Sequence, residues 1–173
     1  MRIRGVVLKK LQLREDDELI VCYTENFGKR RYLARSSMKT DSKQGSHLDV
    51  LNEVEFSVIE GRHNVLIASA MAVRMFPNLK SSLPALSMAF AVFDVFDVMV
   101  YDHDTDYALW SNLIDTLQNL DAKATDPLTD WRETWSIIER DMVSVLGYGN
   151  HQSMEDISHR PLTSFQFVKS VLK

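Results

Sequence analysis

The chain has 173 residues, is 45% hydrophobic and 25% charged, and carries a formal net charge of −4. This composition is ordinary for a folded globular protein and excludes an intrinsically disordered chain. A single cysteine, Cys22, excludes a disulfide framework and a zinc site built from four cysteines. Cys22 lies in an apolar run, which favours a buried and reduced thiol, as is usual in the cytosol.

The charge is divided unevenly along the sequence. Residues 1–47 hold eleven lysines and arginines against six acidic residues, whereas residues 48–173 hold nine against eighteen. The first part therefore has a balance of +5 and the second a balance of −9. A positive segment in an acidic protein indicates binding to nucleic acid or to another anionic surface.

The first 75 residues follow the pattern of short strands separated by turns. Phe27-Gly28 marks a tight turn, with Gly28 expected at a positive φ, so the strands on either side should form a hairpin. A polar stretch at 38–47 predicts a mobile loop. The predicted strands are 3–11, 18–24, 30–36, 50–60 and 63–75. Five such strands predict a small closed barrel of the OB-fold type, and we assign it residues 1–77.

After residue 77 the hydrophobic pattern changes to the period of helices. The segment 83–101 is apolar on nearly every face and is nearly long enough to span a membrane, but Asp94 and Asp97 lie inside it, so we expect a buried core helix. Further helices are predicted at 106–120, 129–146 and 160–173, with Gly147 ending the third. The predicted fold class is therefore α+β, an N-terminal barrel followed by a helical domain at 78–173. Residues 1–15 show no secretory signal.

No enzymatic motif is recognisable in the sequence. Glycine-rich phosphate loops and paired-histidine zinc motifs are both missing. The acidic run "YDHDTDY" begins like a calcium loop, but Tyr107 and Leu113 stand where that loop needs Gly and Glu. We therefore interpret its acids as helix caps. We expect a protein that is not an enzyme and binds neither a metal nor a cofactor.

Two further pairs of residues have competing interpretations. Asp94 and Asp97 could be paired catalytic acids, but pairing with an arginine such as Arg74 is favoured because buried charges are usually paired. Trp131 and Trp135 share one helix face. Packing in the core is favoured for them, with a groove for a partner as the alternative.

The segment "ENFGKRRYLAR" at 25–35 concentrates positive charge in one hairpin. Strand alternation places Arg31, Leu33 and Arg35 on one face and Arg30, Tyr32 and Ala34 on the other. Binding of single strands needs a cationic groove and aromatic rings on which bases stack, for which Tyr32, Phe27 and Tyr23 are candidates. The candidate nucleic-acid-binding residues are Arg4, Lys9, Lys10, Lys29, Arg30, Arg31, Tyr32, Arg35, Lys39 and Lys43. A merely solvated strand is the alternative.

The order of these motifs resembles the RecO family of bacterial recombination mediators. The matching positions are Gly5-Val6-Val7-Leu8, Thr24 with Gly28-Lys29, Ala34-Arg35, and the basic loop with Lys39, Ser42 and Lys43. Later, "VLGYG" at 145–149 and "RPLTSFQFVKSVL" at 160–172 are similar to the end of a family helix and to the family's C-terminal segment.

The sequence also departs from the family pattern. Members are typically longer and carry a ribbon and further helices between the positions of Gly149 and Arg160. The zinc-ligating cysteines of some members are missing, so we expect a shortened member without zinc. Ser36 stands where many members have glycine, and Phe165 stands where they have arginine.

The resemblance implies a non-enzymatic role in DNA repair. Members bind single- and double-stranded DNA, anneal strands, and help a recombinase to load on DNA coated with single-strand-binding protein. The implied partners are RecR and the acidic C-terminal tail of single-strand-binding protein, the recombinase indirectly, and no membrane. The implied location is the bacterial cytoplasm at the nucleoid. Phosphate contacts would fall to Arg30, Arg31, Arg35, Lys39 and Lys43.

Two other functions remain open from the sequence. The helical domain could make the chain a protein-binding adaptor with weak or no DNA binding. An OB-type barrel could also bind structured RNA in translation. Salt dependence of DNA binding separates the first alternative from a mediator, and preference for structured RNA over single-stranded DNA identifies the second.

Overall fold

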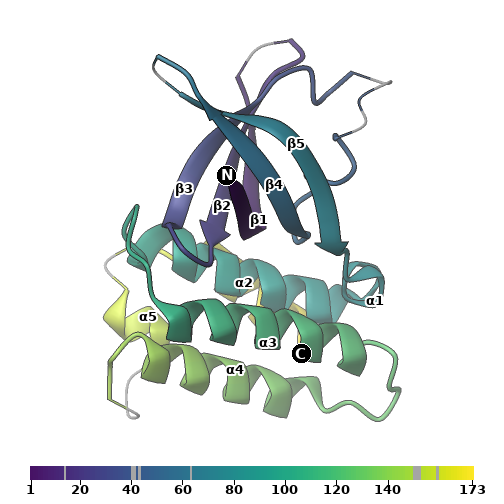
Figure 1. The fold of residues 1–173 in the computed structure, drawn as a ribbon. Coiled ribbons are helices and arrows are strands. Elements are labelled where there is room, and N and C mark those ends of the chain that lie inside the picture. The colour runs from purple at the N-terminus through teal and green to yellow at the C-terminus, as the bar shows by residue number, and fades with distance from the viewer. Residues whose placement is uncertain (14, 40–41, 43, 63, 150–152, 159) are drawn as a thin grey trace. The chain divides into compact units, whose positions relative to one another are not determined.

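The computed structural model describes the chain except for residues 14, 40–41, 43, 63, 150–152 and 159. The chain forms two compact units, one of residues 1–75 with 102–106 and the other of residues 76–101 with 107–173. Figure 1 shows the strands in the first unit and the helices in the second.

The strands of the first unit close into a barrel (Figure 1). Its order is β1-β2-β3-β5-β4, with β1 also pairing with β4. The pairings are antiparallel except for β3 with β5, which run parallel where Leu33 lies opposite Leu66. The strands are β1 (Arg2–Gln12), β2 (Glu18–Thr24), β3 (Gly28–Ala34), β4 (Glu53–Glu60) and β5 (Val65–Arg74). The prediction of a five-stranded OB-fold barrel is confirmed.

Alternation along the strands builds the barrel core. Ile20 and Cys22 of β2 and Tyr32 and Ala34 of β3 belong to one buried apolar cluster. The Tyr32 ring meets the Phe56 ring edge-on, with the ring centroids 4.8 Å apart. Because neighbouring residues of a strand point to opposite sides, the odd-numbered residues of β3 must face outward.

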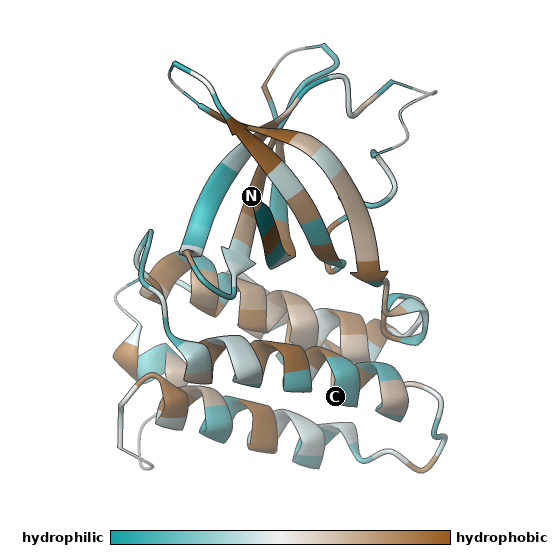
Figure 2. Cartoon of the chain, in the orientation of Figure 1, coloured by the Kyte–Doolittle hydropathy of each residue, from teal (hydrophilic) through white to brown (hydrophobic). Residues whose placement is uncertain are grey.

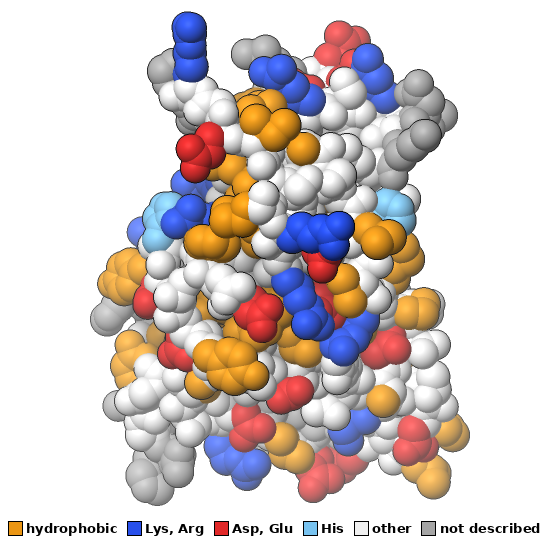
Figure 3. Space-filling view, in the orientation of Figure 1, with side chains coloured by type: hydrophobic (Ala, Val, Ile, Leu, Met, Phe, Trp, Pro, Cys, Tyr) orange, Lys and Arg blue, Asp and Glu red, His pale blue; other side chains and the backbone are white. Residues whose placement is uncertain are grey.

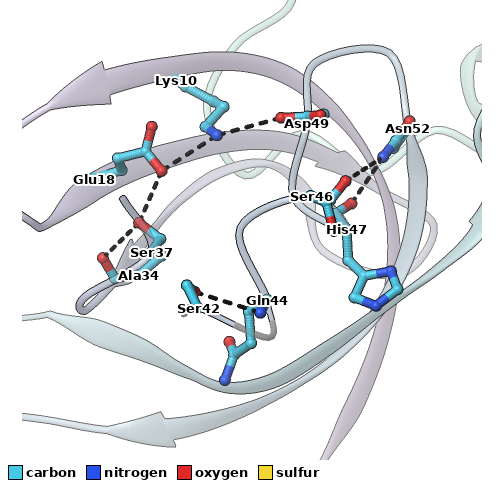
Figure 4. A network of polar contacts seen from close by, with 10 residues as sticks. All are labelled: Lys10, Glu18, Ala34, Ser37, Ser42, Gln44, Ser46, His47, Asp49 and Asn52. Carbon is cyan, nitrogen blue, oxygen red and sulfur yellow. Dashed lines mark hydrogen bonds and ion pairs between the residues drawn. The ribbon is translucent and has the colours of Figure 1, made fainter. Parts of the chain in front are cut away.

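A polar network fixes the long connection between β3 and β4 to the first two strands (Figure 4). The Lys10 Nζ atom lies 3.2 Å from a Glu18 carboxylate oxygen and 3.5 Å from an Asp49 oxygen. The Ser37 hydroxyl donates a hydrogen bond of 2.7 Å to Glu18. The Asn52 amide donates to the carbonyl oxygens of residues 46 and 47. These bonds tie the described part of the loop predicted at 38–47 to the barrel.

Helices in the second unit surround one apolar helix. The helices are α1 (Pro77–Ser81), α2 (Leu83–Met99), α3 (Tyr107–Lys123), α4 (Trp131–Val145), α5 (Met154–Ile157) and α6 (Thr163–Val171). The α2 helix packs against α1, α3, α4 and α6 and buries most of its length. No helix among the described residues is both long and apolar enough to span a membrane. Gly147 follows α4 at a positive φ of 84°, as its predicted role in ending that helix requires.

Asp94 has a structural role in this unit. Its carboxylate accepts hydrogen bonds from the Ser164 backbone N–H at 2.8 Å and from the Thr163 hydroxyl at 3.3 Å, so it caps the start of α6. Arg74, the partner suggested for it, forms an ion pair with Glu53 in the barrel. The pairing of Asp94 with Arg74 is therefore replaced by a helix cap.

Packing between α4 and α6 explains the aromatic residues of both helices. The rings of Trp135 and Phe165 meet edge-on with their centroids 5.0 Å apart, and Phe165 is buried. An arginine in place of Phe165 would bury a charge against an indole ring. The interpretation of Trp135 as a packing residue is confirmed.

Ser36, directly after β3, occupies a backbone conformation that suits glycine. Its φ is 52°, in the left-handed region, and its N–H donates to an Asp17 carboxylate oxygen at 2.9 Å. Residues with a Cβ pay about 1–2 kcal/mol for this conformation. This strain explains why the resembled family has glycine at this position. Serine is accommodated here, but it lowers the stability of the fold.

Replacing Ser36 by glycine should raise the free energy of unfolding by about 0.5–1 kcal/mol, because the strain disappears and the bond from the backbone N–H remains. Urea unfolding monitored by circular dichroism measures the change. Ser144→Gly, on an exposed face of α4, removes the same side chain where φ is helical and should lower the stability. Equal losses in both variants would contradict the assignment of strain to Ser36.

Candidate nucleic-acid interface

The hairpin of β2 and β3 is closed by one buried threonine. The Thr24 hydroxyl donates to the Gly28 carbonyl at 2.9 Å and accepts from the Phe27 N–H at 3.2 Å. Gly28 has a φ of 62°, as predicted for the turn. Thr24 and Gly28 therefore act together to reverse the chain and to start β3. Figure 2 shows this strand as strongly hydrophilic near its start.

Strand register places basic residues beside an apolar strip on the outer face of β1, β2 and β3. Lys9 lies opposite Val21, which lies opposite Arg31. Neighbouring strands are about 4.8 Å apart, so the backbones of Lys9 and Arg31 are roughly 10 Å apart. The next outward row is Leu11, Leu19 and Leu33. On the outer side of these strands, one row therefore has Val21 between the two cations Lys9 and Arg31, and the next row consists of leucines.

A groove beside this face has a volume of about 450 Å³. Its lining comes from β2, β3 and the turn between β4 and β5, and consists of Leu19, Arg31, Glu60, Gly61, Arg62, Asn64 and Val65. In OB-folds the face of the second and third strands and the loop between the fourth and fifth strands contact nucleic acid. Arg62 and Asn64 were not predicted as site residues, although the predicted strands 50–60 and 63–75 leave Gly61 and Arg62 between them as a turn.

Four of the predicted basic residues are exposed. Arg31 projects outward with 59% of its side chain exposed, and Lys9 and Arg35 are also on the surface. Lys39 is exposed beside Asp16, with an Nζ-to-oxygen distance of 3.8 Å. These four side chains are open to solvent.

Other predicted residues make contacts within the barrel. Arg30 is half-buried, and its guanidinium lies 5.2 Å from the centroid of the Phe27 ring. Arg4 pairs with Glu53, whose other oxygen lies 3.2 Å from Arg74. Lys10 belongs to the network around Glu18, and Lys43 lies outside the described residues. Figure 3 shows basic side chains interspersed with acidic ones on the face that it presents.

Two of the three aromatic rings predicted as stacking platforms are buried, Tyr32 in the barrel core and Tyr23 on the outer side, with its hydroxyl bonded to the Asp106 backbone. Tyr32 is 1% exposed, and Tyr23 is fully buried. A base could stack on Tyr32 only if the barrel opened, so the prediction that Tyr32 contacts DNA is corrected. Phe27 is partly exposed, with Arg30 over its ring. Burial raises the pKa of Tyr23 and of Tyr32 from 10.0 to about 12.

Residues 102–106, which we call the strap, lie on the hairpin as part of the barrel unit. The His103 N–H donates to the Lys29 carbonyl at 2.9 Å, and the Tyr23 hydroxyl bonds to the backbone of Asp106. The Asp102 carboxylate lies 3.7 Å from Lys29 Nζ and 3.4 Å from an Arg31 nitrogen. The interpretation of these acids as helix caps missed this contact because it joins residues distant in the sequence.

Gly28 is required by the strap as well as by the turn. A Cβ atom placed on Gly28 would stand 2.1 Å from the carbonyl oxygen of Asp104, closer than any real contact. The backbone of the strap therefore approaches the turn at a point where only glycine leaves room.

Replacing Gly28 by alanine should lower the free energy of unfolding by about 2 kcal/mol or more, since strain at a positive φ is added to a clash with the strap. Thermal and urea unfolding measure the loss. Gly147→Ala is the matched control because it has a positive φ of 84° with no atom within 4 Å of the added Cβ. An equal loss in both variants would show that the strap does not crowd Gly28.

The buried tyrosines predict a loss of stability at alkaline pH. The unfolded chain releases a tyrosine proton near pH 10, whereas folded Tyr23 and Tyr32 hold theirs to about pH 12. Stability from this source is complete below about pH 10 and declines between about pH 10 and 12. Urea unfolding across that range should show the decline, and Tyr32→Phe should reduce it. A free energy of unfolding that stays constant up to pH 12 in the unmodified chain would contradict the burial.

Comparison with known proteins shows which family the barrel resembles. Residues 1–76 match the model of the recombination protein O N-terminal domain. A DNA repair protein RecO of Dehalococcoides mccartyi is 27% identical over 120 residues, covering 69% of this chain and 47% of the relative. That of Geobacter sulfurreducens is 27% identical over 150 residues, covering 86% and 59%. That of Mesoplasma florum is 36% identical over 62 residues, covering 36% and 23%.

The chain spans about half the length of the curated relatives that it matches along most of its own length. These relatives share the name DNA repair protein RecO. The chain is similar to the RecO family, most clearly through its barrel at residues 1–76.

Proposed function

We propose that the chain acts in DNA repair as a recombination mediator and binds single-stranded DNA along the outer face of β1, β2 and β3. In this proposal residues 1–77 are the nucleic-acid-binding domain and residues 78–173 are the helical domain. The observation that supports it most is the groove beside β3, where Arg31 and Arg62 come together from separate hairpins.

The chemistry of this face suits a phosphate backbone. Lys9, Arg31 and Arg35 are exposed on the first three strands or just after them, and Arg62 adds a cation from the turn between β4 and β5. Each neutralised phosphate releases counterions, so the affinity should depend strongly on salt. Exposed Leu11 and half-buried Leu19 offer bases and sugars a small apolar surface without an aromatic ring, whereas Leu33 is buried. Binding of this kind has little sequence preference.

Strand annealing follows from the same chemistry. Two DNA strands repel each other through their phosphates, and a cationic surface that neutralises both lowers this barrier. The step needs no covalent chemistry, so the proposed role is not enzymatic. Binding of double-stranded DNA would use the same phosphate contacts.

Two partners and one outcome of the proposed mediator rest on the resemblance to this family alone. We propose RecR and the acidic C-terminal tail of single-strand-binding protein as partners, and recombinase loading as the outcome. The relatives are named as DNA repair proteins. A titration of this chain with a peptide copying the acidic tail tests the second partner separately from DNA.

The triple variant Lys9→Ala, Arg31→Ala and Arg62→Ala should bind a labelled oligothymidylate more weakly. It should also lower the slope of log affinity against log salt by about 2, since each lost phosphate contact removes about 0.7 for single strands. Fluorescence anisotropy over a salt series measures both quantities.

The matched control removes three exposed cations from the helical unit, as Lys123→Ala, Arg140→Ala and Arg160→Ala. It makes the same change in net charge and should leave the slope near that of the unmodified chain. No binding at low salt would refute the proposal and favour a protein-binding adaptor. Equal losses in the two triple variants would refute the location on the barrel. Preferential retention of structured RNA would favour a role in translation.

A further inference from the structure

We infer that Lys29 and Arg31 form a subsite for a backbone phosphate of the bound strand, and that the Asp102 carboxylate occupies this subsite in the free protein. The inference rests on the proposed DNA binding and adds to it an internal competitor. Asp102 belongs to the strap, which lies between α2 and α3 in the sequence and on the hairpin in the fold.

The geometry is that of an anion held by two cations. One Asp102 oxygen lies 3.7 Å from Lys29 Nζ, and the other lies 3.4 Å from an Arg31 nitrogen. A phosphodiester has two non-bridging oxygens that can take the same two places. The cations also belong to the strand that lines the proposed groove, so a strand bound there passes beside them.

The contact with Asp102 is of a kind that a phosphate can displace. Both distances exceed the 2.7–2.9 Å of a tight charged hydrogen bond, and the carboxylate is 39% exposed. Ion pairs with this exposure are weak and are screened by salt. A phosphate on a polyanion gains counterion release in addition, and a carboxylate fixed to the protein does not.

A second bridging carboxylate in the barrel shows the contrasting case. Glu53 joins Arg4 to Arg74 and has no exposed side-chain surface. Replacing it by a phosphate would require opening the sheet between β1, β4 and β5. Among the ion pairs of the described residues, only Asp102 bridges two cations and keeps its own carboxylate exposed. Arg31 is exposed beside it, and the Lys29 side chain is 7% exposed, so a phosphate reaches Lys29 only where the carboxylate now lies.

The strap keeps its place without the Asp102 carboxylate. Its backbone is held by the bond from His103 to Lys29, by the Tyr23 hydroxyl at Asp106, and by close packing against Gly28. None of these contacts uses the Asp102 side chain. Neutralising that side chain should therefore release the subsite and leave the barrel and the strap intact.

The Asp102 carboxylate limits which anions can bind at the subsite. A tethered carboxylate acts at a high effective concentration, so an isolated anion such as inorganic phosphate competes poorly with it. An oligonucleotide that also contacts Lys9 and Arg62 holds its phosphate near the subsite by the same effect. The arrangement favours extended polyanions over small anions.

The test measures anisotropy of a labelled oligothymidylate of about 20 nucleotides, long enough to cover one OB-fold. Asp102→Asn should bind about fivefold more tightly than the unmodified chain at low salt, which corresponds to the loss of one partly exposed ion pair. Asp104→Asn is the matched control, because it makes the same charge change in the strap and its carboxylate pairs with no cation among the described residues. It should change the affinity by less than about twofold.

A double-mutant cycle separates the subsite from a general effect of charge. In the background of Arg31→Met, Asp102→Asn should give less than about half of its effect on log affinity, because one of the two cations that it releases is gone. An equal gain from Asp102→Asn and Asp104→Asn, or a full gain in the Arg31→Met background, would overturn the inference. Asp102→Ser replaces Asp102→Asn if circular dichroism shows that the latter does not fold.

The outcomes also distinguish this inference from the function on which it rests. Salt-dependent binding by the unmodified chain with no gain in Asp102→Asn would overturn the subsite alone. Binding seen only in Asp102→Asn would support the subsite and show that the competitor is strong. Absence of binding in every variant at low salt would overturn both.

Discussion

The burial of Tyr32 against Phe56 is the contact on which the rest of the barrel surface depends. It fixes which side of β3 faces the core, and alternation then turns Arg31 and Leu33 outward. A shift of one residue would bury Arg31 and expose the tyrosine ring. The position of every cation on this strand is therefore a consequence of core packing. The same contact removes Tyr32 from any role in base stacking.

The turn before β3 explains why its two recognisable residues occur together. Thr24 closes the turn with its hydroxyl, and Gly28 both adopts a positive φ and leaves room for the Asp104 carbonyl. The strap then brings Asp102 to Lys29 and Arg31. One short hairpin thus combines chain reversal, a contact with a distant segment, and the cations of the proposed interface.

The charge of the barrel serves two separate purposes. Arg4, Arg74 and Lys10 pair with carboxylates and hold β1, β4 and the connection to β4 in place. Lys9, Arg31 and Arg35 are exposed on or beside the first three strands. A count of charges along the sequence cannot separate these groups, since the separation depends on which carboxylates fold next to which cations. The proposed interface is therefore smaller than the number of basic residues suggests, and it includes Arg62 from another hairpin.

Sequence patterns predict the barrel, its five strands, the buried helix that follows, and the positive φ of Gly28, because periodicity and turn residues are local properties. The roles of individual side chains depend instead on contacts that form only in the folded chain. Asp94 caps a helix 70 residues further on, and Asp102 crosses from the connection after α2 to Lys29. The local sequence pattern indicates neither contact, since each joins segments that are far apart in the sequence. For the same reason the sequence does not show which face of β3 points outward. The packing of Tyr32 inside the closed barrel determines it.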